Sequence, residues 1–131
     1  MGEIDAFPMA VDNVLKTKNA LERLKTLALL DEEKCSMIAD EYFKICREYG
    51  VSNALIVDKS LSNLRYAYAI NHVFNKAIFV VTKRNEIDNA WSIYRTQFSN
   101  SLHWSWNIRK IKNVIDNESR LAKILANSKK R

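Results

Sequence analysis

Residues 86–115 read EIDNAWSIYRTQFSNSLHWSWNIRKIKNVI, and this stretch decides the fold that the sequence predicts. It contains all three tryptophans of the chain. On a helical wheel, one narrow apolar stripe consists of Trp104, Ile108, Ile111 and Ile115. Trp106 falls on the opposite face, beside Arg109 and Lys110. We therefore expect a helix over 103–126 that packs through Trp104 and leaves Trp106 exposed among cations.

A second apolar stripe precedes this one. Its members recur at helical spacing and are Ile87, Trp91, Tyr94, Phe98 and Leu102. They predict a helix that begins after Asn85 and anchors the core, because aromatic side chains bury large areas. Residues 99–101 are expected to form a turn before the next helix, and 117–119 a possible second break.

The front half of the chain predicts a helical hairpin. Apolar positions between residues 10 and 30 recur at helical spacing, which indicates a first helix. Asp31 is placed to cap a second helix, and Gly50 to end it. Residues 1–9 are expected to form a flexible leader, and 127–131 a basic tail that frays in solvent.

The segments 53–58 and 77–83 are short, apolar and β-branched, so periodicity does not separate strand from buried helix. Two strands here would make a βαβ unit over 53–83 and an α/β fold, with Asp58 and Lys83 ending the strands. The chain has only two glycines and one proline, which favours helices joined by short loops. We therefore predict an all-α, single-domain bundle of four to five helices over 1–131, including a third helix over 53–75.

Charge is distributed unevenly along the chain. Residues 1–58 hold seven Lys and Arg against eleven Asp and Glu, whereas residues 59–131 hold fourteen against four. A basic half that carries every tryptophan suggests a polyanionic partner. The candidate nucleic-acid-binding residues are Trp106, Arg109, Lys110, Lys112, Arg120, Lys123, Lys129, Lys130 and Arg131.

These features predict a small intracellular nucleic-acid-binding protein with an accessory or regulatory role and no enzymatic activity. Cations would neutralise phosphates while an exposed tryptophan stacks on bases, which leaves DNA and RNA equally open. The many apolar stripes also make a homodimer plausible. A non-enzymatic adaptor or inhibitor, in which the acidic front half docks a basic partner, is a further alternative.

The run 43–65 resembles a helix-turn-helix DNA-binding motif. Cys46 takes the small-residue position, Gly50 makes the turn, and Ser52 is placed to cap a second helix. Lys59 departs from the pattern, because a recognition helix normally turns an apolar residue inward at that position. The resemblance implies a DNA-reading helix after Gly50.

Arg65 and His72 have an Arg-x6-His spacing that is similar to the signature of the HEPN family of helical ribonucleases. The resemblance implies that both lie near a scissile phosphate, where the cation stabilises the transition state and the histidine moves a proton. Tyr66 stands where the family usually has a polar residue. This gives an alternative function as a ribonuclease, with Arg65 and His72 catalytic.

Other chemistry is sparse in the sequence. Cys35 and Cys46, with the two histidines, have no zinc-like spacing, so we expect no metal and no cofactor. There is no glycine-rich phosphate loop. Neither a secretory signal nor an apolar run long enough to span a membrane is present, so a cytoplasmic location is expected.

Overall fold

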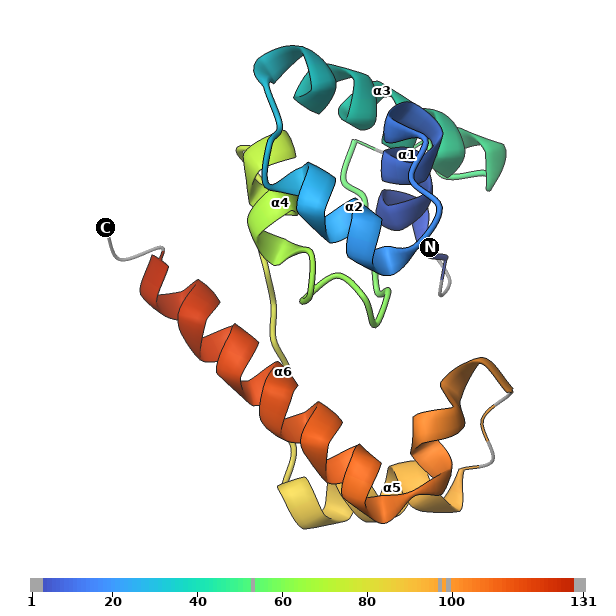
Figure 1. Ribbon diagram of the computed structural model, residues 1–131, viewed down its shortest axis with the longest axis vertical. Coiled ribbons are helices and arrows are strands. Elements are labelled where there is room, and N and C mark those ends of the chain that lie inside the picture. Colours follow the sequence, from blue (N-terminus) through green and yellow to red (C-terminus); the bar gives the residue numbers. More distant parts are fainter. Residues whose placement is uncertain (1–3, 53, 97, 99, 129–131) are drawn as a thin grey trace. The chain divides into compact units, whose positions relative to one another are not determined.

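A computed structural model describes residues 4–52, 54–96, 98 and 100–128 (Figure 1). Within these residues the chain forms six α-helices, one 3-10 helix and no strand. The all-α class is therefore confirmed, and the α/β alternative with a βαβ unit at 53–83 is wrong for this part of the chain. The residues group into two compact units, unit 1 (Met1–Ile78) and unit 2 (Phe79–Arg131). The single domain over 1–131 stays a prediction.

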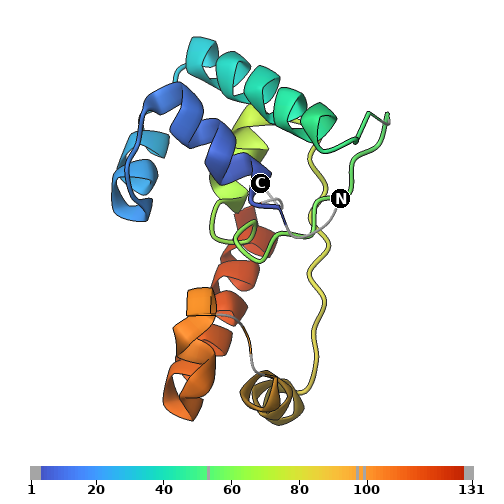
Figure 2. The ribbon, with the colours of Figure 1, turned by 90° about the vertical axis from the view of Figure 1, so that its right-hand side faces the viewer.

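Unit 1 is built from four helices, which are α1 (Ala6–Leu15), α2 (Ala20–Leu27), α3 (Glu32–Glu48) and α4 (Ala67–Val73). Helix α1 packs against α2 and α3, and α4 packs against α3. Figure 2 shows α3 (teal) lying across α1 (blue). Their shared core includes Phe7, Val11, Ile38, Tyr42, Ile45, Cys46 and Tyr66.

The flexible leader expected over 1–9 is wrong from residue 6 onward. Helix α1 begins at Ala6, and Phe7 and Val11 are buried one turn apart on its inner face. Pro8 lies in the first turn, where a backbone N–H would have no partner within the helix, so its missing donor costs little. The part of the expected leader from Ala6 onward thus belongs to the core of unit 1.

Helix α1 and helix α2 replace the single helix expected over 10–30. Lys16 ends α1 in the left-handed region, with a φ of 55°. Asn19 then starts α2, because its side-chain oxygen accepts a hydrogen bond from the backbone N–H of Glu22 at 3.0 Å. The backbone at Lys16 and Asn19 therefore divides the chain into two helices, although the apolar residues recur at helical spacing across this break.

Helix α3 agrees with its prediction. The Asp31 carboxylate accepts a hydrogen bond from the backbone N–H of Lys34 at 2.8 Å. At the other end, the helix stops at Glu48, and Gly50 takes a φ of 76° that other residues rarely adopt.

The helix expected over 53–75 is wrong except for α4. Residues 61–66 instead form turns, and the Asp58 carboxylate before them accepts hydrogen bonds from the Ser60 N–H (2.9 Å) and the Tyr42 hydroxyl (3.2 Å). Short polar side chains that bond the backbone compete with helix formation. No recognition helix follows Gly50 among the described residues 54–66, so the helix-turn-helix prediction is also wrong.

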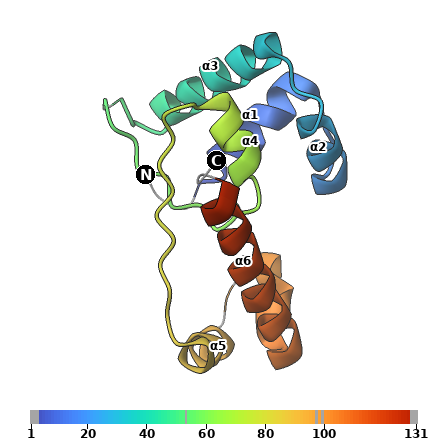
Figure 3. The ribbon, with the colours of Figure 1, turned by 90° about the vertical axis from the view of Figure 1, so that its left-hand side faces the viewer.

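Unit 2 contains α5 (Glu86–Arg95), a 3-10 helix η1 (Asn100–Trp106) and α6 (Ile108–Ser128). Helix α6 packs against both of the others, and Figure 3 shows it beside the orange turns of η1. Ile111 and Ile115 are buried on α6, as predicted. Residues 117–119 continue the helix without the expected break.

Helix α6 begins at Ile108, not at residue 103 as predicted. The Asn107 side-chain oxygen accepts hydrogen bonds from the backbone N–H groups of Arg109 (3.0 Å) and Lys110 (3.1 Å). This cap restarts the chain as an α-helix after the 3-10 turns of η1. Trp104 and Trp106 therefore both lie in η1, outside the helix that was expected to carry them.

Helix α5 begins after Asn85, as predicted, because the Asn85 side chain accepts hydrogen bonds from the N–H groups of Ile87 and Asp88. It ends at Arg95, well before the expected Leu102. The aromatic stripe was expected to anchor the core, and this is wrong: no residue of α5 is buried.

Unit 1 is braced by a partly buried ion pair between α1 and α2. The Arg23 guanidinium donates to the Asp12 carboxylate, with one contact at 2.8 Å, and to the Tyr66 hydroxyl at 2.8 Å. The hydrogen bond from Arg23 holds the pKa of Asp12 below its ordinary value, against the opposing effect of burial. The charged form of Asp12 is thus part of the folded state.

We expect Phe7→Ala to lower the free energy of unfolding by about 3–5 kcal/mol, because it leaves a cavity in the unit 1 core. Met9→Ala is the matched control, since Met9 is exposed on the same helix, and should cost less than about 1 kcal/mol. Urea denaturation measures both. Equal effects would mean that α1 does not contribute to the core as described.

We expect Asp12→Asn to lower the free energy of unfolding by about 2 kcal/mol at neutral pH, because Arg23 loses its charged partner. A carboxyl group whose pKa is lower in the folded state than in the unfolded state stabilises the fold at pH values above its unfolded pKa, which is about 4. This stabilisation is lost as the pH falls through the pKa of the folded state. The difference from wild type should therefore shrink in acid. Urea denaturation across pH tests this against Asp40→Asn, an exposed carboxylate on α3, which should change little.

Candidate functional site

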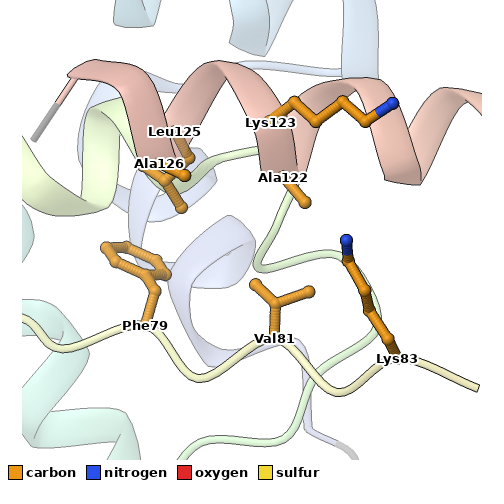
Figure 4. Close-up of a pocket in the computed structure, with 7 residues that line it drawn as sticks. All are labelled: Phe79, Val81, Lys83, Ala122, Lys123, Leu125 and Ala126. Carbon is orange, nitrogen blue, oxygen red and sulfur yellow. The ribbon is translucent and has the colours of Figure 1, made fainter.

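A cavity of about 310 Å³ lies within unit 2 (Figure 4). It is formed between the extended segment 79–83 and the later turns of α6. Its lining residues are Phe79, Val81, Lys83, Ala122, Lys123, Leu125 and Ala126.

The extended segment supplies its lining residues by alternation. In extended backbone, every second side chain points to the same side. Phe79, Val81 and Lys83 accordingly face α6, whereas Val80 between them is exposed (Figure 4). The β-branched residues of this segment favour extended backbone over helix. Hence a stretch that periodicity left ambiguous becomes one wall of the cavity.

The cavity has a cationic end and an apolar end. Lys83 and Lys123 are its two charged lining residues, and Figure 4 shows both ammonium groups on the side away from Phe79 and Ala126. Both lysines are exposed, so their charge is available to a ligand that enters from solvent. Such a site suits an anion that carries an apolar or planar group.

The structure places one predicted binding residue, Lys123, at this cavity. The other predicted cations on α6 are exposed but do not line it; they are Arg109, Lys110, Lys112 and Arg120. Lys112 pairs with Asp116 at 2.7 Å. Lys129, Lys130 and Arg131 lie outside the described residues.

Lys83 was considered only as a strand end in the α/β alternative, so its place in the cavity was missed. The alternation of Phe79, Val81 and Lys83 was the sequence signal that could have found it. Asp58, named with Lys83 in that alternative, lies in unit 1 and is hydrogen-bonded by Tyr42.

Trp106 is 52% exposed, which agrees with its predicted outward orientation. Its ring meets that of His103 edge-on, with 5.4 Å between the ring centroids. Trp104 is half-buried. The two tryptophans thus differ in burial as predicted, although neither lies on α6.

Arg65 and His72 do not form a catalytic pair. Arg65 lies in the turns before α4 and His72 in the last turn of α4, and both side chains are exposed. No hydrogen bond or ion pair joins them in the described part of the chain.

A profile described as "Sulfotransferase family" matches residues 6–130. The chain belongs to the sulfotransferase family. No curated protein and no solved structure gives a significant match.

Membership of the sulfotransferase family corrects the function predicted from sequence. The prediction of a nucleic-acid-binding regulator is wrong, and so is the alternative of a HEPN-like ribonuclease with Arg65 and His72. The alternative of a non-enzymatic adaptor or inhibitor is contradicted by the same match. The match says nothing about partners, so bound nucleic acid and a homodimer stay predictions. Among the described residues, no helix is long and apolar enough to cross a membrane. The cytoplasmic location stays a prediction.

Proposed function

We propose that this protein transfers a sulfuryl group from an activated sulfate donor to a nucleophilic acceptor, and that the unit 2 cavity binds the donor through Lys83 and Lys123. The observation that carries the proposal is the family match over residues 6–130. The cavity supports it, because two of its seven lining residues are lysines and the other five are apolar.

The reaction itself explains why paired cations are useful. An oxygen or nitrogen of the acceptor forms a bond to sulfur while the bond between sulfur and the bridging oxygen of the donor breaks. The leaving group keeps the electron pair, and the acceptor proton passes to a base in solvent. Negative charge therefore builds on the leaving oxygen, where a nearby ammonium group stabilises it.

Lys83 and Lys123 fit an anionic donor because their side chains carry positive charge. Glycine-rich phosphate loops hold anions through backbone N–H groups, and they need several closely spaced glycines. This sequence has two glycines, and Gly50 ends α3 in unit 1. Lysine side chains are the alternative means of holding sulfate or phosphate oxygens, because each supplies a point charge and three donors.

We expect purified full-length protein to bind radiolabelled phosphoadenylyl sulfate, a nucleotide-linked activated sulfate, and to transfer its label to a hydroxyl or amine acceptor. Lys83→Gln and Lys123→Gln should each weaken donor binding by about tenfold, the effect of losing one charge-assisted contact. Filter binding and label transfer measure the two steps separately.

Lys110→Gln is the matched control, because it removes the same charge from an exposed position on α6 that does not line the cavity. It should change donor binding by less than about twofold, since Lys110 makes no contact with a donor in the cavity and salt screens its charge over that distance. Wild-type protein that neither binds the donor nor transfers label would refute the proposed function. Equal losses in all three variants would refute the assignment of the cavity.

A further inference from the structure

Helix α5 turns its largest apolar side chains to solvent. Ile87, Trp91 and Tyr94 are 79%, 57% and 49% exposed, and they recur at helical spacing on one face. The Trp91 and Tyr94 rings stack, with centroids 6.2 Å apart and planes inclined by 28°. These three residues are called the aromatic face.

The half-buried residues of α5 lie on its other side; they are Asn89, Ala90, Ser92 and Ile93. Helix α5 packs against α6 and η1 within unit 2, so its inner surface already has partners there. The aromatic face is not needed for that packing. A contiguous apolar face of this kind in water usually marks an interaction surface.

The charge around the aromatic face indicates what covers it. Unit 2 holds eleven Lys and Arg against four Asp and Glu. Arg84 precedes α5 and Arg95 lies one turn after Trp91, while Glu86 and Asp88 lie in the first turn of α5; all four are exposed, so the positive charge belongs to unit 2 as a whole. A second copy of the chain would bring two strongly positive units together, which their repulsion disfavours. An apolar partner with negative surface charge is favoured instead.

The residue types of the face suit one such partner in particular. Tryptophan and tyrosine combine an apolar ring with a polar N–H or O–H, and they concentrate at the boundary between lipid headgroups and acyl chains. Basic side chains near this boundary are attracted to anionic lipids. Aromatic anchors on a unit with a strong positive net charge are typical of proteins that lie on a membrane without crossing it.

We propose that unit 2 binds the surface of an anionic lipid bilayer. Ile87, Trp91 and Tyr94 enter the headgroup region, and basic residues that do not line the cavity, such as Arg84 and Arg95, contact the lipid charges. The aromatic face shares no residue with the cavity, and lipid binding does not depend on sulfuryl transfer.

Vesicle flotation of the full-length protein tests the proposal. We expect the protein to float with phosphatidylcholine vesicles that contain phosphatidylserine, and much less with pure phosphatidylcholine. Added salt should release it, because it screens the attraction between cations and lipid. The double variant Trp91→Ala with Tyr94→Ala should weaken binding by at least about tenfold, because it removes the apolar anchors.

The matched control is Leu29→Ala with Tyr68→Ala, which removes two exposed apolar side chains from unit 1. Binding of this control should stay within about twofold of wild type. Circular dichroism should show both double variants folded, since all four positions are exposed. Label transfer to a water-soluble acceptor should be unchanged in the Trp91 and Tyr94 variant, which separates this test from that of the proposed function.

Several outcomes would overturn the proposal. The first is no flotation with anionic vesicles, and the second is equal flotation with neutral ones. Flotation that survives loss of Trp91 and Tyr94 would mean that charge alone binds the lipid. Binding to soluble polyglutamate that requires Trp91 and Tyr94, without flotation, would assign the face to an acidic protein. Self-association that requires the same residues, seen by sedimentation, would assign it to a second copy.

Discussion

The extended path of segment 79–83 alongside α6 is the constraint on which the proposed site depends. Because this backbone is extended, Phe79, Val81 and Lys83 all point to the side of the cavity that Lys123 also lines. A helix over these residues would turn successive side chains by about 100° and would separate Lys83 from Val81. The same extended backbone therefore sets both the apolar wall of the cavity and the position of Lys83.

Side-chain caps explain which helix boundaries could be predicted. Asp31 and Asn85 stand directly before apolar periodic stretches, and both were identified. Asn19 and Asn107 cap helices in the same way, but each lies in the middle of an apolar stripe that continues before and after it in the sequence. A wheel plot is insensitive to such interruptions, because it reports which residues share a face and not whether the backbone is continuous.

The same limitation applies to burial. The apolar stripes of α5 and α6 are equally regular in sequence, yet Ile111 and Ile115 are buried whereas Ile87 and Trp91 are exposed. Periodicity identifies an apolar face but not the surface that covers it, which depends on tertiary contacts. The all-α class followed from composition, whereas the cavity required the actual path of residues 79–83.

Net charge predicted a nucleic-acid-binding function, and that function is wrong. Positive potential attracts nucleic acid, activated sulfate and anionic lipid alike, because the attraction depends on charge and hardly on chemistry. What distinguishes these ligands is the apolar surface beside the cations. Lys83 and Lys123 line a small cavity with apolar walls, which suits one molecule, whereas Arg95 adjoins an exposed aromatic face, which suits an extended surface. The two proposals therefore assign different anions to different cations of the same unit.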